Sequence, residues 1–166
     1  LILTGAAPSF ADAQNTDSGS GSIKLKASAD INWDDAPEIS GTSAIMIDAG
    51  SGAILYEKNA YEQRDPASIT KIITALIALE NLDMNEEVTA YNEPDPEGTN
   101  IALKVGETLT AEQMINATLI ASANDAADAL AMHMGGSWEG FAEMMNERAA
   151  QCGAKDTEFS NPSGLT

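Results

Sequence analysis

The stretch Asp65-Pro66-Ala67-Ser68-Ile69-Thr70-Lys71, which continues as Ile72-Ile73-Thr74-Ala75-Leu76-Ile77-Ala78-Leu79-Glu80, decides the expected fold of this chain. From Ile69 to Leu79 the residues are apolar nearly all round, which predicts a helix that is buried on most sides. Asp65 is a suitable N-cap, and Pro66 suits the first helical position, where a missing N–H costs nothing. We therefore expect a core helix that begins near Pro66.

Two polar residues of this helix, Ser68 and Lys71, share one face because they lie three positions apart. A buried lysine is costly unless it is paired or neutral, and burial lowers its pKa from the reference value of about 10.4. A neutral Lys71 could take the proton from Ser68 and make it a nucleophile. The alternative is a lysine that reaches the surface beside a helix-start serine. The S-x-x-K motif by itself does not decide between a buried base and a lysine at the surface.

The composition limits the classes of protein and site. With 43% hydrophobic and 20% charged residues, the 166-residue chain is typical of one globular domain. The net charge of -18 argues against nucleic acid or an anionic membrane surface as a partner. Cys152 is the only cysteine and His133 the only histidine, so no intramolecular disulfide and no Cys/His zinc cluster can form. We expect no metal and no cofactor.

The N-terminal segment has the pattern of a targeting sequence. Residues 1–8 resemble the end of an apolar signal-peptide core, and Ala11-Asp12-Ala13 fits a small-residue cleavage site. We interpret residues 1–13 as a signal-peptide remnant, which predicts an extracytoplasmic protein; the alternative is a frayed N-terminal segment. Residues 14–36, rich in Ser and Gly, have the composition of a flexible linker. The folded part is then 37–166. The sequence contains no run of about 18 apolar residues, so it predicts no membrane span.

The remaining segments predict an α+β fold with a helical second half. Residues 43–48 and 53–57 read as a β-hairpin, and 87–90 and 101–106 as short extended segments. Thr110 with Gln113 forms a capping box that opens a helix towards Ala121. Two more helices are expected at 126–134 and 138–151. The architecture is therefore an N-terminal β-hairpin, the buried helix that carries Ser68, and a helical lobe.

A second polar group, Ser122-Ala123-Asn124, interrupts the helical lobe 54 residues after Ser68. Taken alone, Ser122 or Asn124 would simply cap the following helix. The chain contains one S-x-x-K and one S-x-N, in this order, so the two motifs together favour a catalytic site.

At this point the sequence resembles a known family. Pro66-Ala67-Ser68-Ile69-Thr70-Lys71 together with Ser122-Ala123-Asn124 resembles the active-site signature of the penicillin-binding serine peptidases, most closely the low-molecular-mass D-alanyl-D-alanine carboxypeptidases. The likeness extends over roughly Pro37 to Thr166. It includes the segments 47–59, 103–107 and Phe159-Ser160-Asn161-Pro162-Ser163-Gly164-Leu165.

The resemblance implies part of a β-lactamase/DD-peptidase-like fold. The family completes its site with a K-[ST]-G strand, whereas this sequence offers only Lys104-Val105-Gly106, which by resemblance belongs to a different loop. We therefore expect an N-terminal fragment, 37–166, of the catalytic domain. The C-terminal sheet strands and any C-terminal membrane anchor would then lie outside the sequence, and the fragment alone would be inactive.

The resemblance also implies the role of each site residue. Ser68 would be the acylated nucleophile, Lys71 its base, and Ser122 the relay of a proton to the leaving amine. Asn124 would bind the substrate amide and hold Lys71. The substrate class would be peptidoglycan stem peptides ending in D-Ala-D-Ala, with β-lactam antibiotics as acylating inhibitors and no metal or cofactor.

Three rival functions remain open from the sequence. A serine β-lactamase would share S-x-x-K, and Glu158-Phe159-Ser160-Asn161 offers an E-x-x-N for the required glutamate. An endopeptidase of the same family would differ only in the cross-link it cleaves. A non-catalytic envelope binding module would be consistent with the absence of K-[ST]-G.

Overall fold

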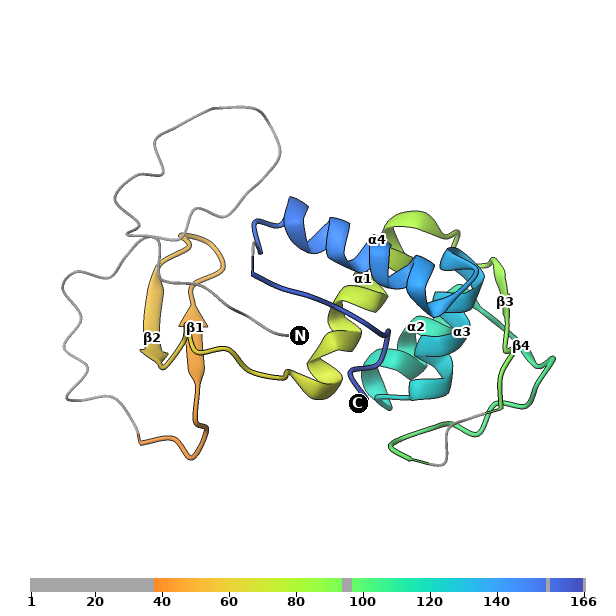
Figure 1. The fold of residues 1–166 in the computed structure, drawn as a ribbon, viewed down its shortest axis with the longest axis horizontal. Helices are drawn as coiled ribbons and strands as arrows, with labels where there is room; N and C mark the ends of the chain where they lie inside the picture. The colour runs from red at the N-terminus through yellow and green to blue at the C-terminus, as the bar shows by residue number, and fades with distance from the viewer. Residues whose placement is uncertain (1–37, 94–96, 155, 166) are drawn as a thin grey trace. The chain divides into compact units, whose positions relative to one another are not determined.

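The structure is a computed structural model that describes residues 38–93, 97–154 and 156–165 (Figure 1). The described residues form two compact units that divide between Glu62 and Gln63. The predicted signal-peptide remnant (1–13) and linker (14–36) lie outside the described residues. Within the described part, none of the helices has the length and apolar character needed to cross a membrane.

The first unit contains the β-hairpin that the sequence predicts. Strand β1 (Ala44–Ile47) pairs antiparallel with β2 (Ile54–Lys58), and the register shifts between Met46 and Ile47. The turn is held by Asp48, whose carboxylate accepts the Ser51 N–H at 2.7 Å. Gly52 closes the turn with a positive φ of 71°, which costs a glycine little.

The second unit begins with a short 3₁₀ helix, η3 (Ala67–Thr70), which leads directly into α1 (Lys71–Asn81). The helical segment begins next to Pro66, as predicted, but the predicted roles of Asp65 and Pro66 at its start were wrong. Pro66 is the residue before η3, no side chain caps it, and Ala67 has a left-handed φ of 46°. A helix cannot run through that conformation, so Asp65 does not cap it and Pro66 is not its first residue.

The prediction that this helix is buried on most sides is confirmed for most of its residues, but one side is open to solvent. Ile69, Ile72 and Leu79 are 65%, 61% and 51% exposed. Ala75 and Ala78 are buried, on the side that packs against the other helices. An all-apolar helix carries no sequence signal for which side is covered.

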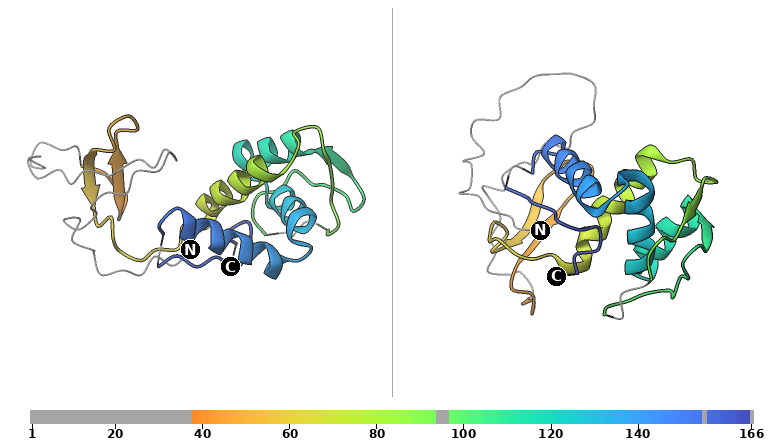
Figure 2. Two further views of the ribbon diagram at one scale, coloured as in Figure 1. Left: turned by 90° about the horizontal axis from the view of Figure 1, so that it is seen from above. Right: turned by 45° about the vertical axis from the view of Figure 1, so that its right-hand side comes forward.

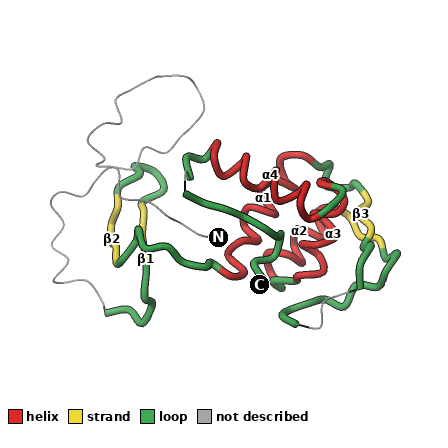
Figure 3. The backbone as a smooth tube through the Cα atoms, viewed as in Figure 1, coloured by secondary structure: helices red, strands yellow, loops and turns green. Residues whose placement is uncertain are grey.

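Two short strands and the first lobe helix follow α1. Strand β3 (Glu87–Thr89) pairs antiparallel with β4 (Thr108–Thr110), and α2 (Ala111–Ile120) begins at once after β4. The strand predicted at 87–90 is confirmed. The one predicted at 101–106 was wrong, because these residues form a loop and the partner strand comes later (Figure 3).

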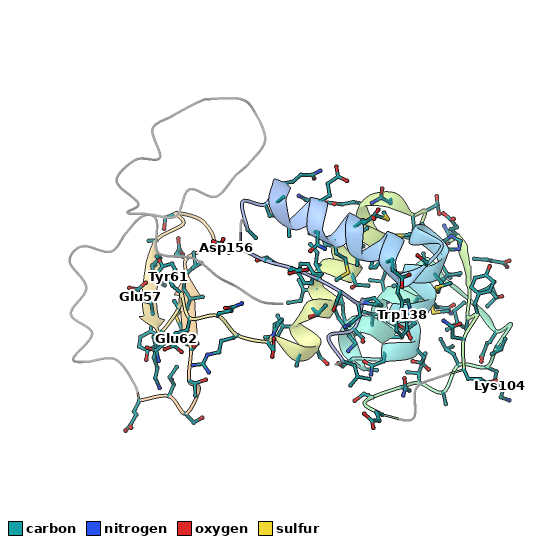
Figure 4. The ribbon with its side chains drawn as sticks, viewed as in Figure 1. Glu57, Tyr61, Glu62, Lys104, Trp138 and Asp156 are labelled. Carbon is teal, nitrogen blue, oxygen red and sulfur yellow. The ribbon has the colours of Figure 1, made fainter. Side chains whose placement is uncertain are left out.

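The helix ends agree with their capping signals. Thr110 Oγ1 accepts the Gln113 N–H at 3.2 Å while Gln113 Oε1 accepts the Thr110 N–H at 2.9 Å, which confirms the capping box. Helix α3 (Asn124–Gly135) ends at Gly136, which has a left-handed φ of 69°. Helix α4 (Trp138–Gln151) has the predicted bounds, and Figure 4 labels Trp138 at its first residue and Lys104 in the loop before β4.

Helix α3 lies at the centre of the second unit, where it packs against α1, α2 and α4 (Figure 2). The larger core is built from α1, α2, α3 and the strands β3 and β4, around Val88, Met114 and Leu130. A second core joins α1, α3 and α4 to the C-terminal segment through Phe141 and Phe159. This packing fixes the start of α1 and the start of α3 in one unit, which is what a site built from both requires.

Candidate active site

The pair Ser68 and Lys71 comes together where η3 passes into α1. Lys71 Nζ lies 3.0 Å from Ser68 Oγ, within hydrogen-bonding distance. The Lys71 side chain is only 2% exposed, whereas Ser68 is exposed to solvent. The sequence predicted the shared face and left two alternatives for Lys71, and the structure shows the buried lysine instead of the one at the surface.

The C-terminal segment supplies a second partner for Lys71. The Lys71 ammonium donates to the Ser163 carbonyl oxygen at 3.1 Å, and one turn further along α1 the Thr74 hydroxyl donates to the Pro162 carbonyl at 2.7 Å. These bonds hold Lys71 against Ser68. The sequence did not predict the Ser163 contact; its only signal was the likeness of the Asn161-Pro162-Ser163-Gly164 turn to the family.

Asn161 organises this turn. Its Oδ1 accepts the Ser163 N–H at 3.1 Å and the Gly164 N–H at 2.7 Å, and its Nδ2 donates to the Leu165 carbonyl at 3.0 Å. An asparagine that satisfies several nearby backbone groups fixes a tight turn. The Ser163 carbonyl therefore keeps its direction towards Lys71.

Gly164 brings the same turn into contact with the backbone that precedes Ser68. Its φ is +76°, and a Cβ atom there would overlap the Ala67 carbonyl oxygen and lie 2.6 Å from the carbonyl carbon. The same atom would lie 2.7 Å from Thr70 Oγ1. Glycine is therefore required twice, by the backbone conformation and by the close approach.

Burial lowers the pKa of the Lys71 ammonium below the ordinary value of 10.5, and the negative charge of Asp128 on α3 opposes this shift. Desolvation is the larger of the two effects because the charged form loses its water. A larger fraction of Lys71 is therefore neutral near pH 7 than for an exposed lysine. A neutral amine 3.0 Å from a hydroxyl can accept its proton.

Ser122 and Asn124 lie at the start of α3 without capping it. The N-cap residue is Ala123 and no side chain caps the helix, so the alternative role of a cap was wrong. Ser122 has a left-handed φ of 55°. Asn124 is 5% exposed, and its Nδ2 donates to the Glu97 carbonyl at 3.5 Å. Among the described residues, neither side chain is hydrogen-bonded to Ser68 or Lys71.

The other candidate catalytic and metal-binding residues make no hydrogen bond with Ser68 or Lys71 in the described part of the chain. Glu158 is exposed, and within the described ranges its carboxylate makes no hydrogen bond with Ser68 or Lys71. His133 Nε2 lies 2.8 Å from Glu86 Oε1 and ties α3 to the turn before β3. No group of three metal-ligating side chains occurs in the described part of the chain.

Comparison with protein families places these motifs in a known context. The family model described as D-alanyl-D-alanine carboxypeptidase, peptidase family S11, matches residues 30–166. The matched region contains Ser68, Lys71, Ser122 and Asn124.

Individual relatives and solved structures agree with that match. The chain is 42% identical over 130 residues to D-alanyl-D-alanine carboxypeptidase DacF of Bacillus subtilis, covering 75% of this chain and 33% of that protein. It is 30% identical over 133 residues to the D-alanyl-D-alanine endopeptidase of Escherichia coli, covering 78% and 43% of the two chains. The crystal structure of DacD from Francisella tularensis superposes with a TM-score of 0.73 at 32% identity, covering 78% and 33%. The chain thus spans about a third of the Bacillus subtilis relative.

Proposed function

Because the chain belongs to the D-alanyl-D-alanine carboxypeptidase family of penicillin-binding serine peptidases, we propose that the full-length protein removes the terminal D-alanine from peptidoglycan stem peptides through an acyl-enzyme on Ser68. One observation supports the assignment of this reaction to residues of this chain. The buried Lys71 amine lies 3.0 Å from the exposed Ser68 hydroxyl. A nucleophile with an adjacent base is the arrangement that acyl transfer requires.

In the proposed acylation, Ser68 Oγ attacks the carbonyl carbon of the penultimate D-alanine while Lys71 Nζ takes the hydroxyl proton. The new C–O bond forms and the C–N bond to the terminal D-alanine breaks. The departing amine needs a proton, and Ser122 passes it the one that Lys71 took from Ser68, so that Lys71 is neutral again. The Ser68 backbone N–H donates to the developing oxyanion, an interaction worth about 10²–10³ in rate at other acyl-transfer sites.

In the proposed deacylation, water attacks the Ser68 ester and Lys71 again accepts a proton. The stem peptide leaves with a new carboxylate and Ser68 regains its hydrogen. Asn124 binds the substrate amide and keeps it in line with Ser68. No step requires a metal or an organic cofactor.

The proposed substrate also suggests where the protein acts. Peptidoglycan lies outside the cytoplasm, and the apolar residues 1–8 followed by Ala11-Asp12-Ala13 are consistent with export. We assign residues 1–13 to the signal-peptide remnant, 14–36 to a linker and 37–166 to the N-terminal part of the catalytic domain. β-Lactams would acylate Ser68 as substrate analogues, and any membrane anchor would belong to a further C-terminal part.

The direct test of the activity is release of D-alanine from a synthetic peptide ending in D-Ala-D-Ala by the full-length protein expressed from its gene. We expect release by the wild type and a loss of about 10³-fold or more in Ser68→Ala, because the nucleophile is gone. Ser51→Ala, which removes a hydroxyl in the hairpin turn, is the matched control and should keep the wild-type rate.

The same preparation separates the proposed function from its rivals. Fast turnover of penicillin without release of D-alanine would identify a β-lactamase. Cleavage only of a cross-linked peptide would identify an endopeptidase. A folded protein that cleaves none of these substrates would contradict a catalytic role and leave a binding module.

A further inference from the structure

The loop of residues 97–103 is hydrogen-bonded to the first turn of α3, a connection that the sequence did not predict. The Asn124 N–H donates to the Thr99 carbonyl at 2.7 Å. The next residue, Asp125, donates its N–H to Asn100 Oδ1 at 3.2 Å. The two backbone N–H groups that open α3 are therefore satisfied by this loop instead of by a cap on the helix itself.

The Asp125 carboxylate is the main anchor of the loop. It accepts the Leu103 N–H at 2.9 Å through Oδ2, and the Ile101 N–H at 3.2 Å through Oδ1. The two donors flank Ala102, which has a left-handed φ of 60°. Asp125 is only 6% exposed, so these backbone donors replace the water that its carboxylate loses on burial.

The anchored loop forms a wall against the Asn124 side chain. Gly98 has a φ of +80°, and a Cβ atom at this position would overlap Asn124 Nδ2. The same atom would lie 3.7 Å from Leu165 Cδ1, in the turn whose Ser163 carbonyl binds Lys71. The loop therefore contacts the Asn124 amide, which donates to the Glu97 carbonyl at 3.5 Å, and leaves no room for a side chain at Gly98.

We propose that Asp125 is a positioning residue: by fixing the 97–103 loop, it sets the direction of the Asn124 amide towards the substrate. The proposal rests on the proposed function, since it concerns the same site. Asp125 itself touches no reacting atom. Loss of its carboxylate would release the Ile101 and Leu103 N–H groups, and the loop would no longer confine Asn124.

A role in positioning differs measurably from a role in stability alone. If Asp125 only stabilised the fold, Asp125→Asn would lower the fraction of folded protein but leave each folded molecule with the wild-type rate. If it positions Asn124, the rate constant of every folded molecule falls. The pseudo-first-order rate constant of acylation by a fluorescent penicillin, divided by the folded fraction that urea unfolding gives for the same variant, separates the two.

The test compares Asp125→Asn with wild type in the full-length protein. We expect complete labelling with a rate constant about 10- to 100-fold lower, the range that small misplacements of a positioning group produce. Asp83→Asn is the matched control, because the Asp83 carboxylate also accepts a backbone N–H, that of Asn85 at 2.8 Å, in an exposed turn. It should keep the wild-type rate constant.

A double-mutant cycle makes the proposal falsifiable even if Asp125→Asn folds poorly. Gly98→Ala leaves the carboxylate in place and pushes directly on the Asn124 amide, so it should also lower the rate constant. In an Asn124→Ala background, neither Asp125→Asn nor Gly98→Ala should cost anything further. Additive losses, or a wild-type rate constant in either single variant, would overturn the proposal. If the wild type itself is never labelled, it is the proposed function that fails.

Discussion

Replacing Lys71 by methionine should slow acylation of Ser68 by about 10²–10⁴-fold, the usual contribution of a positioned general base. Methionine keeps most of the buried volume but cannot take the Ser68 proton, which Lys71 Nζ reaches at 3.0 Å. The measurement is the rate constant of labelling by a fluorescent penicillin at fixed pH. Lys58→Met is the matched control, because Lys58 also donates to backbone carbonyls, those of Ile39 and Gly41 at 3.0 and 2.8 Å.

The pH profile distinguishes loss of the base from a packing defect. Because burial holds the pKa of Lys71 below 10.5, the wild-type acylation rate should rise with pH through that lowered pKa and then level off. Lys71→Met should lack this rise. An unchanged profile in Lys71→Met, or an equal loss of rate in Lys58→Met, would show that Lys71 is not the base.

The same titration affects stability with a defined sign. Between the lowered pKa in the folded state and 10.5 in the unfolded state, the unfolded chain binds more protons, so the unfolding free energy rises with pH through this window. The cost of burying the charge is present below the window and vanishes above it. Lys71→Met should remove this slope, which urea unfolding of both proteins at several alkaline pH values would measure.

Replacing Gly164 by alanine should strongly destabilise the second unit. A left-handed φ costs alanine about 1–2 kcal/mol, and forcing an atom into a filled space costs about 1–3 kcal/mol. We therefore expect a loss of about 2–5 kcal/mol in the free energy of unfolding. Acylation should slow as well, because the Ala67 carbonyl that must move lies directly before Ser68.

Two other glycines separate crowding from backbone strain. Gly106 and Gly153 have φ values of +85° and +84°, and a Cβ atom at either would meet nothing within 4 Å. Gly106→Ala and Gly153→Ala should cost only about 1–2 kcal/mol in urea unfolding and leave acylation unchanged. Equal losses at all three positions would contradict the close contact between Gly164 and Ala67.

Local signals in the sequence predicted much of the fold. The capping box at Thr110 and the bounds of α4 depend on neighbouring residues, and the structure bears them out. The start of the Ser68 helix does not depend on local signals alone. The left-handed Ala67 abuts Gly164, and no pattern around Pro66 reveals a contact with so distant a residue.

The sequence also predicted only the part of the candidate site that depends on residues close together in the chain. The spacing of Ser68 and Lys71 along one helix was enough to predict their contact. The bond from Lys71 to the Ser163 carbonyl joins residues 92 positions apart. Because every residue type has a backbone carbonyl, the sequence does not show which one accepts this bond. Asp125 likewise anchors the 97–103 loop through backbone N–H groups. The sequence therefore contains no complementary side chain that would identify the partner of Asp125.

The most direct test of the central claim is to locate the covalent adduct. The full-length protein is incubated with benzylpenicillin, digested, and its peptides are weighed by mass spectrometry. We predict one adduct with the mass of the intact antibiotic on the peptide that contains Ser68, and its absence from Ser68→Ala. A folded protein that carries no adduct, or an adduct on another residue that persists in Ser68→Ala, would contradict Ser68 as the nucleophile.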